Sequence, residues 1–277
     1  MHKSIILNSL KESFTLIWKN KYLSMLLFVL ELLFLVVFSY VNIVYQSRML
    51  ENAKTISEML NKEKLDEADI SSKIMRQEKI LGEELQDINK NFDELAKNFK
   101  LFAAYSFILI AAFASLNWSA ASRMFNKKGF KQFLKIFLRV MVISVFYFGL
   151  IFWASYSLLS TSAADIENIK SLSMYIEIVA LSAILLYFMF ISLALSINNT
   201  FKDIIQKTLL VGIKKIHYTL AAYFINILIF AVAIALLLYF AEKSMFILTI
   251  SIILATFSFV FGRIFLINVV DKVQSSG

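Results

Sequence analysis

The stretch YLSMLLFVLELLFLVVFSYVNIVY, residues 22–45, decides the fold of this chain. At about 1.5 Å of rise per residue, a helix over this stretch is long enough to cross the roughly 30 Å hydrocarbon layer of a bilayer. Glu31 is its only charged residue, and no small-residue cleavage site lies near Tyr45. We therefore interpret the stretch as a retained membrane span rather than a signal peptide.

Five further apolar stretches of similar length follow the first. The six expected spans are 22–45, 101–119, 133–158, 173–197, 218–240 and 245–270. Hydrophobic residues make up 59% of the 277 residues and charged residues 17%, against roughly 45–50% and about 25% in soluble domains. This composition excludes an ordinary soluble domain and predicts an all-α integral membrane protein with six transmembrane helices.

Residues from which active sites are commonly built are scarce. The chain has no cysteine and only two histidines, His2 and His217, so neither a metal site nor a bound cofactor is expected. The sequence also contains no Walker A pattern, no GxGxxG and no GxSxG, the motifs that bind phosphates or carry a nucleophilic serine. We predict that the protein is not an enzyme.

Lysine and arginine are concentrated in alternate short connections. They precede the first span (Lys3, Lys11, Lys19, Lys21) and occupy the second–third loop (Arg123, Lys127, Lys128, Lys131, Lys135) and the fourth–fifth loop (Lys202, Lys207, Lys214, Lys215). The positive-inside rule then places both termini in the cytoplasm and residues 46–100 outside, in the plasma (cytoplasmic) membrane. The net charge of +8 indicates contact with anionic lipid headgroups rather than with nucleic acid. Trp18, Trp118 and Trp153 lie near expected span ends, where aromatic belts form.

A short pattern recurs before each odd-numbered span. Its three copies are Ser9-Leu10-Lys11-Glu12, Gly129-Phe130-Lys131-Gln132 and Thr200-Phe201-Lys202-Asp203. Apolar residues at helical spacing follow each copy, which predicts amphipathic helices at the membrane surface, including segments near 123–135 and 200–216. Ser9 with Glu12, and Thr200 with Asp203, match the capping-box pattern. We expect three units, each an interfacial helix followed by two spans; chance similarity of lysine-rich linkers is the alternative.

This layout resembles the glycerophosphodiesterase membrane-domain-like group of six-helix integral membrane proteins. That group also pairs an interfacial helix with the span after it, through an aromatic-basic-Asn stretch similar to Trp18-Lys19-Asn20. The resemblance covers the membrane part and not residues 46–100. Because this chain has no phosphodiesterase domain, the resemblance implies no catalytic residue.

Residues 46–100 are polar and proline-free, and they show the apolar spacing of a coiled coil. The expected seam is Leu81, Leu85, Ile88, Phe92, Leu95 and Phe99, a 4-3-4-3-4 spacing. A shorter stripe, Met49, Ala53, Ile56 and Leu60, supplies the opposing face, and 61–69 interrupts both patterns as a turn would. We therefore predict an extracytoplasmic helical hairpin whose arms continue from their membrane helices without a break.

The arms of this hairpin are unequal in length. Ile70, Ile74, Met75 and Ile80 lie near the expected tip, on the longer arm. A hairpin that packs only on itself is one interpretation. The other is that these four residues lack intramolecular partners and form the contact site for a partner protein.

Three polar residues interrupt the spans at similar expected depth. They are Glu31 in the first span, Asn226 in the fifth and Arg263 in the sixth. Ionisable groups inside a bilayer are costly and mark functional sites by default. We expect Glu31 and Arg263 to form an ion pair to which Asn226 contributes hydrogen bonds. The pair would either lock the first span to the sixth or form a polar step in a transport path, and mutual neutralisation favours the lock.

These features favour a non-enzymatic scaffold or accessory subunit of a membrane complex, which docks a partner through its hairpin. Small-residue helix faces, such as Ala111, Ser115 and Ser119, offer core packing or a second contact surface. The alternative function is the permease subunit of an ATP-driven exporter, which would require a separate ATPase. If the topology were inverted, a cytoplasmic hairpin would resemble that of membrane insertases. No role is assigned to the polar tail, 271–277.

Overall fold

The computed structural model describes residues 2–63, 86–125, 129–162, 170–240 and 245–275 of the chain. Within these ranges every extended element is helical, and no strand occurs. Six of the described helices are long and apolar enough to cross a membrane. They coincide with the six expected spans, so the prediction of an all-α protein with six membrane-spanning helices is confirmed at this level.

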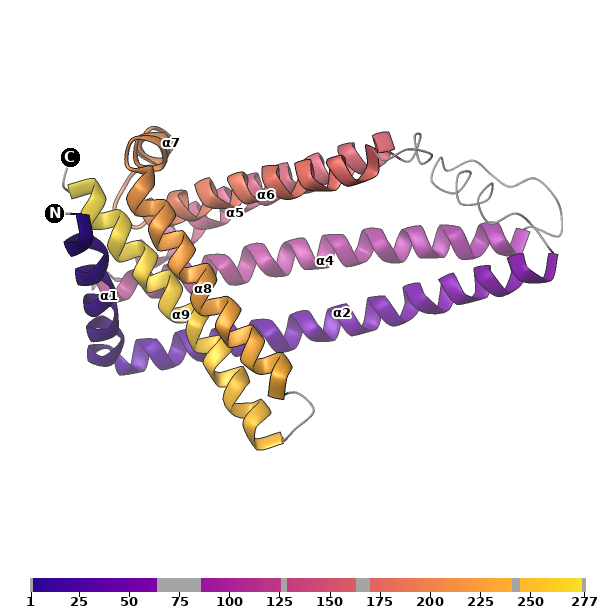
Figure 1. Ribbon diagram of the computed structural model, residues 1–277, viewed down its shortest axis with the longest axis horizontal. Helices are drawn as coiled ribbons and strands as arrows, with labels where there is room; N and C mark the ends of the chain where they lie inside the picture. The colour runs from indigo at the N-terminus through magenta and orange to yellow at the C-terminus, as the bar shows by residue number, and fades with distance from the viewer. Residues whose placement is uncertain (1, 64–85, 126–128, 163–169, 241–244, 276–277) are drawn as a thin grey trace. The chain divides into compact units, whose positions relative to one another are not determined.

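Figure 1 shows the described helices in chain order. Their bounds are α1 His2–Lys19, α2 Lys21–Glu63, α4 Gln86–Phe125, α5 Phe130–Ser162, α6 Lys170–Leu195, α7 Phe201–Leu209, a π-helical turn η2 Leu210–Lys214, α8 Ile216–Phe240 and α9 Met245–Ser275. Both α2 and α4 continue without a break from an expected span into the polar 46–100 region, as the sequence predicts.

Asn20 separates the first amphipathic helix from the first span. Its side-chain amide donates to the backbone oxygen of Leu16 at 3.0 Å, and the hydroxyl of Ser24 donates to the backbone oxygen of Ile17 at 2.9 Å. The Ser24 hydroxyl satisfies a carbonyl near the end of α1, and the Asn20 amide is a second donor to the Leu16 oxygen, which also accepts from the backbone N–H of Asn20. The corner is therefore built by polar residues that follow the amphipathic segment.

The capping box predicted at Thr200 and Asp203 is confirmed at the start of α7. The Thr200 hydroxyl accepts from the backbone N–H of Asp203, and the Asp203 side chain accepts from the backbone N–H of Thr200. The matching prediction at Ser9 and Glu12 is wrong. Ser9 lies well inside α1, where the backbone N–H groups already have helical partners.

The middle repeat also differs from the expected unit. Its amphipathic segment is the first part of α5, which runs from Phe130 to Ser162 as one helix. The first and third units have breaks at Asn20 and Lys215. From Phe130 the helix runs through the amphipathic segment, Lys131, Gln132 and Lys135 included, directly into the span. Within the residues that the structure describes, a separate amphipathic helix therefore precedes the first and fifth spans and not the third.

The chain divides into two compact units. Unit 1 comprises residues 1–35, 111–147 and 184–277. In this unit α9 packs against both α8 and α1 (Figure 1). The C-terminal half of α9 is its most deeply buried segment, with Ile264, Phe265 and Val269 fully enclosed. The core of unit 1 is therefore built around α9.

Unit 2 comprises residues 36–110 and 148–183. Within it, the ring of Tyr45 on α2 lies 6.3 Å from that of Phe102 and 5.8 Å from that of Tyr105 on α4. Further along the two helices, Ile56 and Ile88 are both buried. Residues later in α2 face residues earlier in α4. In this unit α2 and α4 therefore run antiparallel to each other.

Candidate functional site

Glu31 on α2 and Arg263 on α9 form a salt bridge within unit 1. An Arg263 terminal nitrogen donates to the Glu31 carboxylate, and their side chains are 11% and 6% exposed, respectively. This is the pairing expected from the sequence. Because each charge neutralises the other, the pair costs far less in an apolar layer than either charge alone.

Trp118 on α4 is a third partner of this ion pair. The Arg263 guanidinium lies 5.8 Å from the centre of the indole ring, a cation–π arrangement. Trp118 is only 3% exposed, whereas Trp18 and Trp153 are 76% and 69% exposed. The aromatic-belt position stays a prediction for the two exposed tryptophans and is wrong for Trp118, which is buried against Arg263. The position of Trp118 near the end of a span does not indicate whether its side chain faces lipid or the interior of the protein.

Asn226 on α8 lies beside the ion pair but does not bond to either charge. Its side-chain amide donates to the backbone oxygen of Gly262 at 3.0 Å. A Cβ atom on Gly262 would come within 3.2 Å of the Asn226 side-chain oxygen. The residue next to Arg263 is therefore small enough for Asn226 to reach the α9 backbone, which holds α8 and α9 together at the depth of the ion pair.

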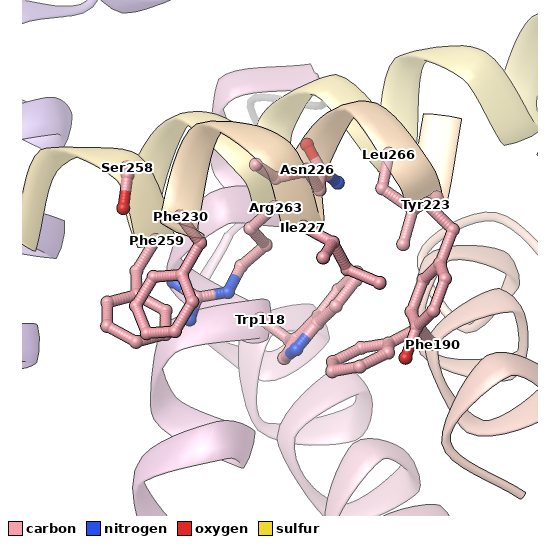
Figure 2. A pocket seen from close by; sticks show the side chains of 11 residues that line it. Trp118, Phe190, Tyr223, Asn226, Ile227, Phe230, Ser258, Phe259, Arg263 and Leu266 are labelled. Carbon is pink, nitrogen blue, oxygen red and sulfur yellow. The ribbon is translucent and has the colours of Figure 1, made fainter. Parts of the chain in front are cut away.

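A pocket opens beside Trp118, Asn226 and Arg263 (Figure 2). Its volume is about 200 Å³. The wall is mainly aromatic and apolar, and it is formed by Trp118, Phe190, Tyr223, Asn226, Ile227, Phe230, Ser258, Phe259, Gly262, Arg263 and Leu266. All these residues belong to unit 1. The pocket is a candidate binding site because a few polar groups converge on an apolar cavity.

Some polar atoms at this pocket remain without a hydrogen-bond partner. They are Nε and Nη1 of Arg263 and the side-chain oxygen of Asn226, and all three atoms are buried. A buried donor without an acceptor is costly, and more so in a layer without water. Figure 2 shows the nitrogen atoms of Arg263 directed among the aromatic side chains of the pocket. These atoms are enclosed by the protein itself, so the surface that the pocket presents is mainly aromatic and apolar.

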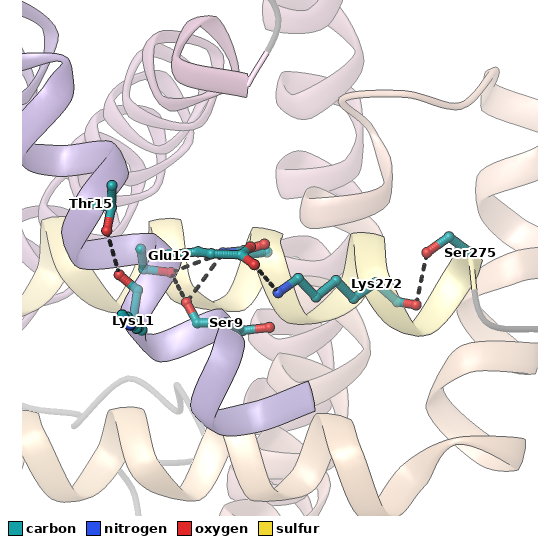
Figure 3. A network of polar contacts seen from close by, with 8 residues as sticks. Ser9, Lys11, Glu12, Thr15, Lys272 and Ser275 are labelled. Atoms are coloured by element: carbon teal, nitrogen blue, oxygen red, sulfur yellow. Dashed lines mark hydrogen bonds and ion pairs between the residues drawn. The ribbon is translucent and has the colours of Figure 1, made fainter. Parts of the chain in front are cut away.

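A second polar cluster joins α9 to α1 (Figure 3). Lys272 pairs with Glu12 at 2.7 Å. The side-chain amide of Asn268 donates to the backbone oxygen of Ser9 at 3.2 Å. Glu12 therefore pairs across helices rather than capping its own helix.

The connection between α6 and α7 holds a third cluster. Arg139 on α5 donates to the backbone oxygens of Ser196 and Asn199, where α6 ends. The side chain of Asn199 exchanges hydrogen bonds with Gln274 at 3.1 and 3.2 Å and accepts from Lys207. Arg139 was not among the residues singled out from the sequence, and no role was expected for the tail that contains Gln274. Their partners lie 57 or more positions away, so no local pattern could have identified them.

The small-residue stripe on α4 is inside the fold. Ala111, Ser115 and Ser119 are all buried in unit 1. This burial corresponds to the core-packing interpretation of the stripe, in which small side chains let helices approach closely.

The described part of the expected hairpin seam is only partly enclosed. Ile88 is buried, Leu95 faces Gln46, Met49, Leu50 and Ala53 across a hollow, and Phe92 is half-buried. Phe99 departs from the expected seam, because its side chain is 59% exposed. A heptad seam stays on one side of a helix only if the helix is slightly under-wound. In α4 the face that carries the expected seam has turned outward at Phe99. Leu81 and Leu85, and the expected contact residues Ile70, Ile74, Met75 and Ile80, lie outside the described residues.

Comparisons with protein-family models, curated proteins and solved structures found no match to this chain. Among the described residues, no group of three or more His, Cys, Asp and Glu side chains is arranged to hold a metal ion.

Proposed function

We propose that the protein is a non-enzymatic scaffold or accessory subunit of a membrane complex, which presents a helical hairpin to a partner protein. The observation that carries this proposal is the length of α2 and α4, with 43 and 40 residues. At about 1.5 Å per residue these helices are roughly 60 Å long, about twice the hydrocarbon thickness of a bilayer. A large part of each helix is therefore available outside the membrane.

The sequence of the outer arms supports a binding role rather than a spanning role. Residues 46–63 of α2 and 86–100 of α4 are rich in charged and amide side chains. The tip residues Ile70, Ile74, Met75 and Ile80 lie outside the described residues, and the proposal that they form the contact surface rests on their apolar spacing in the sequence. Apolar side chains at helical spacing, surrounded by polar ones, are typical of helix-mediated protein contacts.

Our proposal includes an orientation with both termini in the cytoplasm. An even number of spans places the termini on the same side, and the lysine-rich connections favour the cytoplasmic side. Exposed apolar residues on α7 and η2, including Ile205, Leu209 and Ile213, are suited to the lipid surface. Lys202 and Lys214 are exposed near them, where anionic headgroups would contact them.

The orientation is tested with one engineered thiol. Because the chain has no cysteine, Ser71→Cys provides a unique site for a membrane-impermeant maleimide. We expect labelling on intact cells. Labelling only after lysis would invert the topology and favour an insertase-like function.

Partner docking is tested by photo-crosslinking in intact membranes. A photoreactive residue at Ile74 is expected to give a discrete crosslinked product. The matched control is the same residue at Leu254, an exposed position on α9. A second change, Met75→Glu, should abolish the product at Ile74 while membrane insertion is unchanged. The same products from both positions, or no effect of Met75→Glu, would contradict docking through the hairpin.

The exporter-permease hypothesis takes second place because Glu31 and Arg263 bond to each other, as the locking role requires. In a permease these charges would border a substrate path, and a separate ATPase would drive transport. Glu31→Gln in a protein that remains folded would then reduce substrate flux. The resemblance to the glycerophosphodiesterase membrane-domain-like group stays a prediction about the membrane part.

A further inference from the structure

We propose that a groove between α1, α8 and α9 holds an acyl chain of one anionic phospholipid, whose headgroup lies against Lys11. All three helices belong to unit 1. The groove is lined almost entirely by apolar side chains, with Ser258 as the polar exception. The proposal depends neither on partner docking through the hairpin nor on the side of the membrane on which the termini lie.

The groove is open to molecules outside the protein. Phe14, Val232 and Leu254 line it and are half-exposed, whereas Ala233 and Phe261 line it and are buried. The buried side chains therefore form its floor, and the half-exposed ones form its rims. Because the rims are open, an acyl chain from the surrounding bilayer reaches the floor directly.

The groove runs lengthwise between α8 and α9, which are antiparallel. The side chain of Asn226 bonds to the backbone of Gly262, and the rings of Phe230 and Phe259 are 4.6 Å apart. Residues later in α8 therefore face residues earlier in α9, and both form the same end of the groove. Its volume of about 360 Å³ is more than twice that of an apolar cavity of ~150 Å³ that accepts benzene, which leaves room for a segment of methylene chain.

One end of the groove lies at α1, and the other end lies deeper along the apolar part of α9. The ring of Phe14 on α1 is 4.5 Å from that of Phe261 on α9. Beyond Phe261, toward its C-terminus, α9 becomes polar, and Lys272 pairs there with Glu12 of α1. In the opposite direction the groove extends to Leu254, about 10 Å further at helical rise. A linear chain that begins at α1 therefore fits along it.

The exposed face of α1 is suited to the level of lipid headgroups. Leu7, Phe14 and Trp18 are exposed apolar side chains, and their spacing places them on one face of α1 with the exposed Lys11. Apolar side chains on such a face enter hydrocarbon, while a lysine extends its ammonium group to the headgroups. A lipid whose chain enters the groove beside Phe14 therefore keeps its headgroup near Lys11.

The charge of Lys11 selects an anionic headgroup. At about 100° per residue, Lys11 lies roughly 60° from Phe14 around the axis of α1, next to the end of the groove. Among the described residues Lys11 forms no ion pair, whereas the neighbouring Glu12 pairs with Lys272. The positive charge of Lys11 is therefore not neutralised by the protein. A phospholipid with a net negative charge supplies the counter-charge, which a zwitterionic lipid does not.

The test compares two lipids at a photoreactive amino acid placed at Leu236, in the deep part of the groove wall. The full-length protein is reconstituted in nanodiscs of equal parts phosphatidylglycerol and phosphatidylcholine with identical chains, and the crosslinked lipids are identified by mass spectrometry. The matched control is the same amino acid at Ala235, an exposed position at the same depth outside the groove wall. We expect phosphatidylglycerol to be enriched about fivefold at Leu236 relative to Ala235, the factor that corresponds to about 1 kcal/mol for one lysine. Equal lipid ratios at the two positions would overturn the proposal.

Lysine variants on α1 separate Lys11 from the overall charge of the protein. Lys11→Gln should abolish the enrichment at Leu236, and Lys11→Arg should retain it. Lys19→Gln removes the same charge from an exposed position of α1 that lies roughly 140° from Phe14 around the helix axis, and should leave the enrichment unchanged. Enrichment that survives Lys11→Gln, or that Lys19→Gln abolishes equally, would contradict the proposal.

A variant of the floor tests the groove itself. Ala233→Leu fills the floor and should reduce the enrichment at Leu236 to the level at Ala235. Ala231→Leu adds the same side chain at an exposed position of α8 outside the groove wall and should have no effect. Equal enrichment in these two variants would show that the groove does not hold the lipid. If Ala233→Leu does not fold, the comparison of Lys11→Gln with Lys19→Gln still decides.

Discussion

Glu31 and Arg263 stand 232 positions apart in the chain and form a salt bridge within unit 1. The bond ties the N-terminal half of α2 to α9, the helix around which this unit is built. A second long-range ion pair also involves α9: Lys272, near its C-terminal end, pairs with Glu12 in the middle of α1.

Removing one charge of this pair should be much more damaging than removing both. Arg263→Met alone leaves a buried carboxylate, and Glu31→Leu alone leaves a buried guanidinium. Each should lower the free energy of unfolding by about 3–5 kcal/mol, whereas the double variant should cost far less. Unfolding of all three variants in the same detergent closes a double-mutant cycle.

The control for this cycle is the exposed pair Lys54 and Glu58, separated by 3.8 Å on one face of α2. Its removal should change stability by less than about 0.5 kcal/mol. Additive effects of Glu31→Leu and Arg263→Met would show that the two charges do not stabilise each other.

Gly212 should be intolerant of a side chain. A Cβ atom there would approach a ring carbon of Phe188 to 2.7 Å, and the backbone oxygen of Gly212 accepts from the hydroxyl of Tyr187 at 2.9 Å. The Phe188 ring or the π-helical turn would have to shift. Gly212→Ala should therefore destabilise the protein by about 1–3 kcal/mol, measured by thermal unfolding in detergent.

Gly149 is the matched control, because a Cβ atom there meets nothing within 4 Å. Gly149→Ala in α5 should be neutral or stabilising by up to about 1 kcal/mol, as expected for alanine inside a helix. Equal effects of the two substitutions would show that helix propensity, rather than contact with Phe188, decides the outcome.

Arg139 should be needed to hold the end of α6. Its guanidinium donates to two backbone oxygens, of Ser196 and Asn199, and hydrogen bonds from a charged donor contribute about 1.5–3 kcal/mol. Arg139→Gln should destabilise the protein by this amount and speed amide exchange in 196–205. Lys135→Gln, at an exposed position on the same helix, should change neither quantity.

The sequence predicted those features that depend on local pattern. Apolar runs identified all six spans, and hydroxyl and carboxylate three positions apart identified the cap at Thr200. The same spacing at Ser9 was misleading, because helix formation began upstream at His2 and left no free N–H groups for Ser9 to cap. A capping pattern carries information only where the helix actually begins.

The candidate site was predictable in part. Glu31 and Arg263 attract attention because charge is rare in a span, and one acid and one base suggest a pair. Trp118 was missed because its helix face depends on packing between α4 and α9, which no local pattern encodes. Asn226 was expected to bond to a charge, but the absence of a side chain on Gly262 lets it reach the backbone instead.

Acid should weaken the start of α7 through Asp203. The hydroxyl and then the backbone N–H of Thr200 donate to its carboxylate and hold the pKa of Asp203 below its ordinary value. Because the folded-state pKa is the lower one, the cap contributes its full stability above the ordinary carboxyl pKa of about 3.9. This contribution is lost as the pH falls through the lowered value. As the pH falls through that range, amide exchange of α7 in the full-length wild-type protein should therefore accelerate more than in the Asp203→Asn variant. Above that range the two proteins should respond to pH alike.

Thr200→Val separates the cap from other acid effects. Without the hydroxyl, the pKa of Asp203 should rise toward its ordinary value, and an NMR titration of the carboxyl would measure the change. The acid-dependent difference in α7 exchange should then begin at higher pH and be smaller. If the wild-type protein and Asp203→Asn lost protection in parallel throughout the acidic range, Asp203 would not be the group responsible.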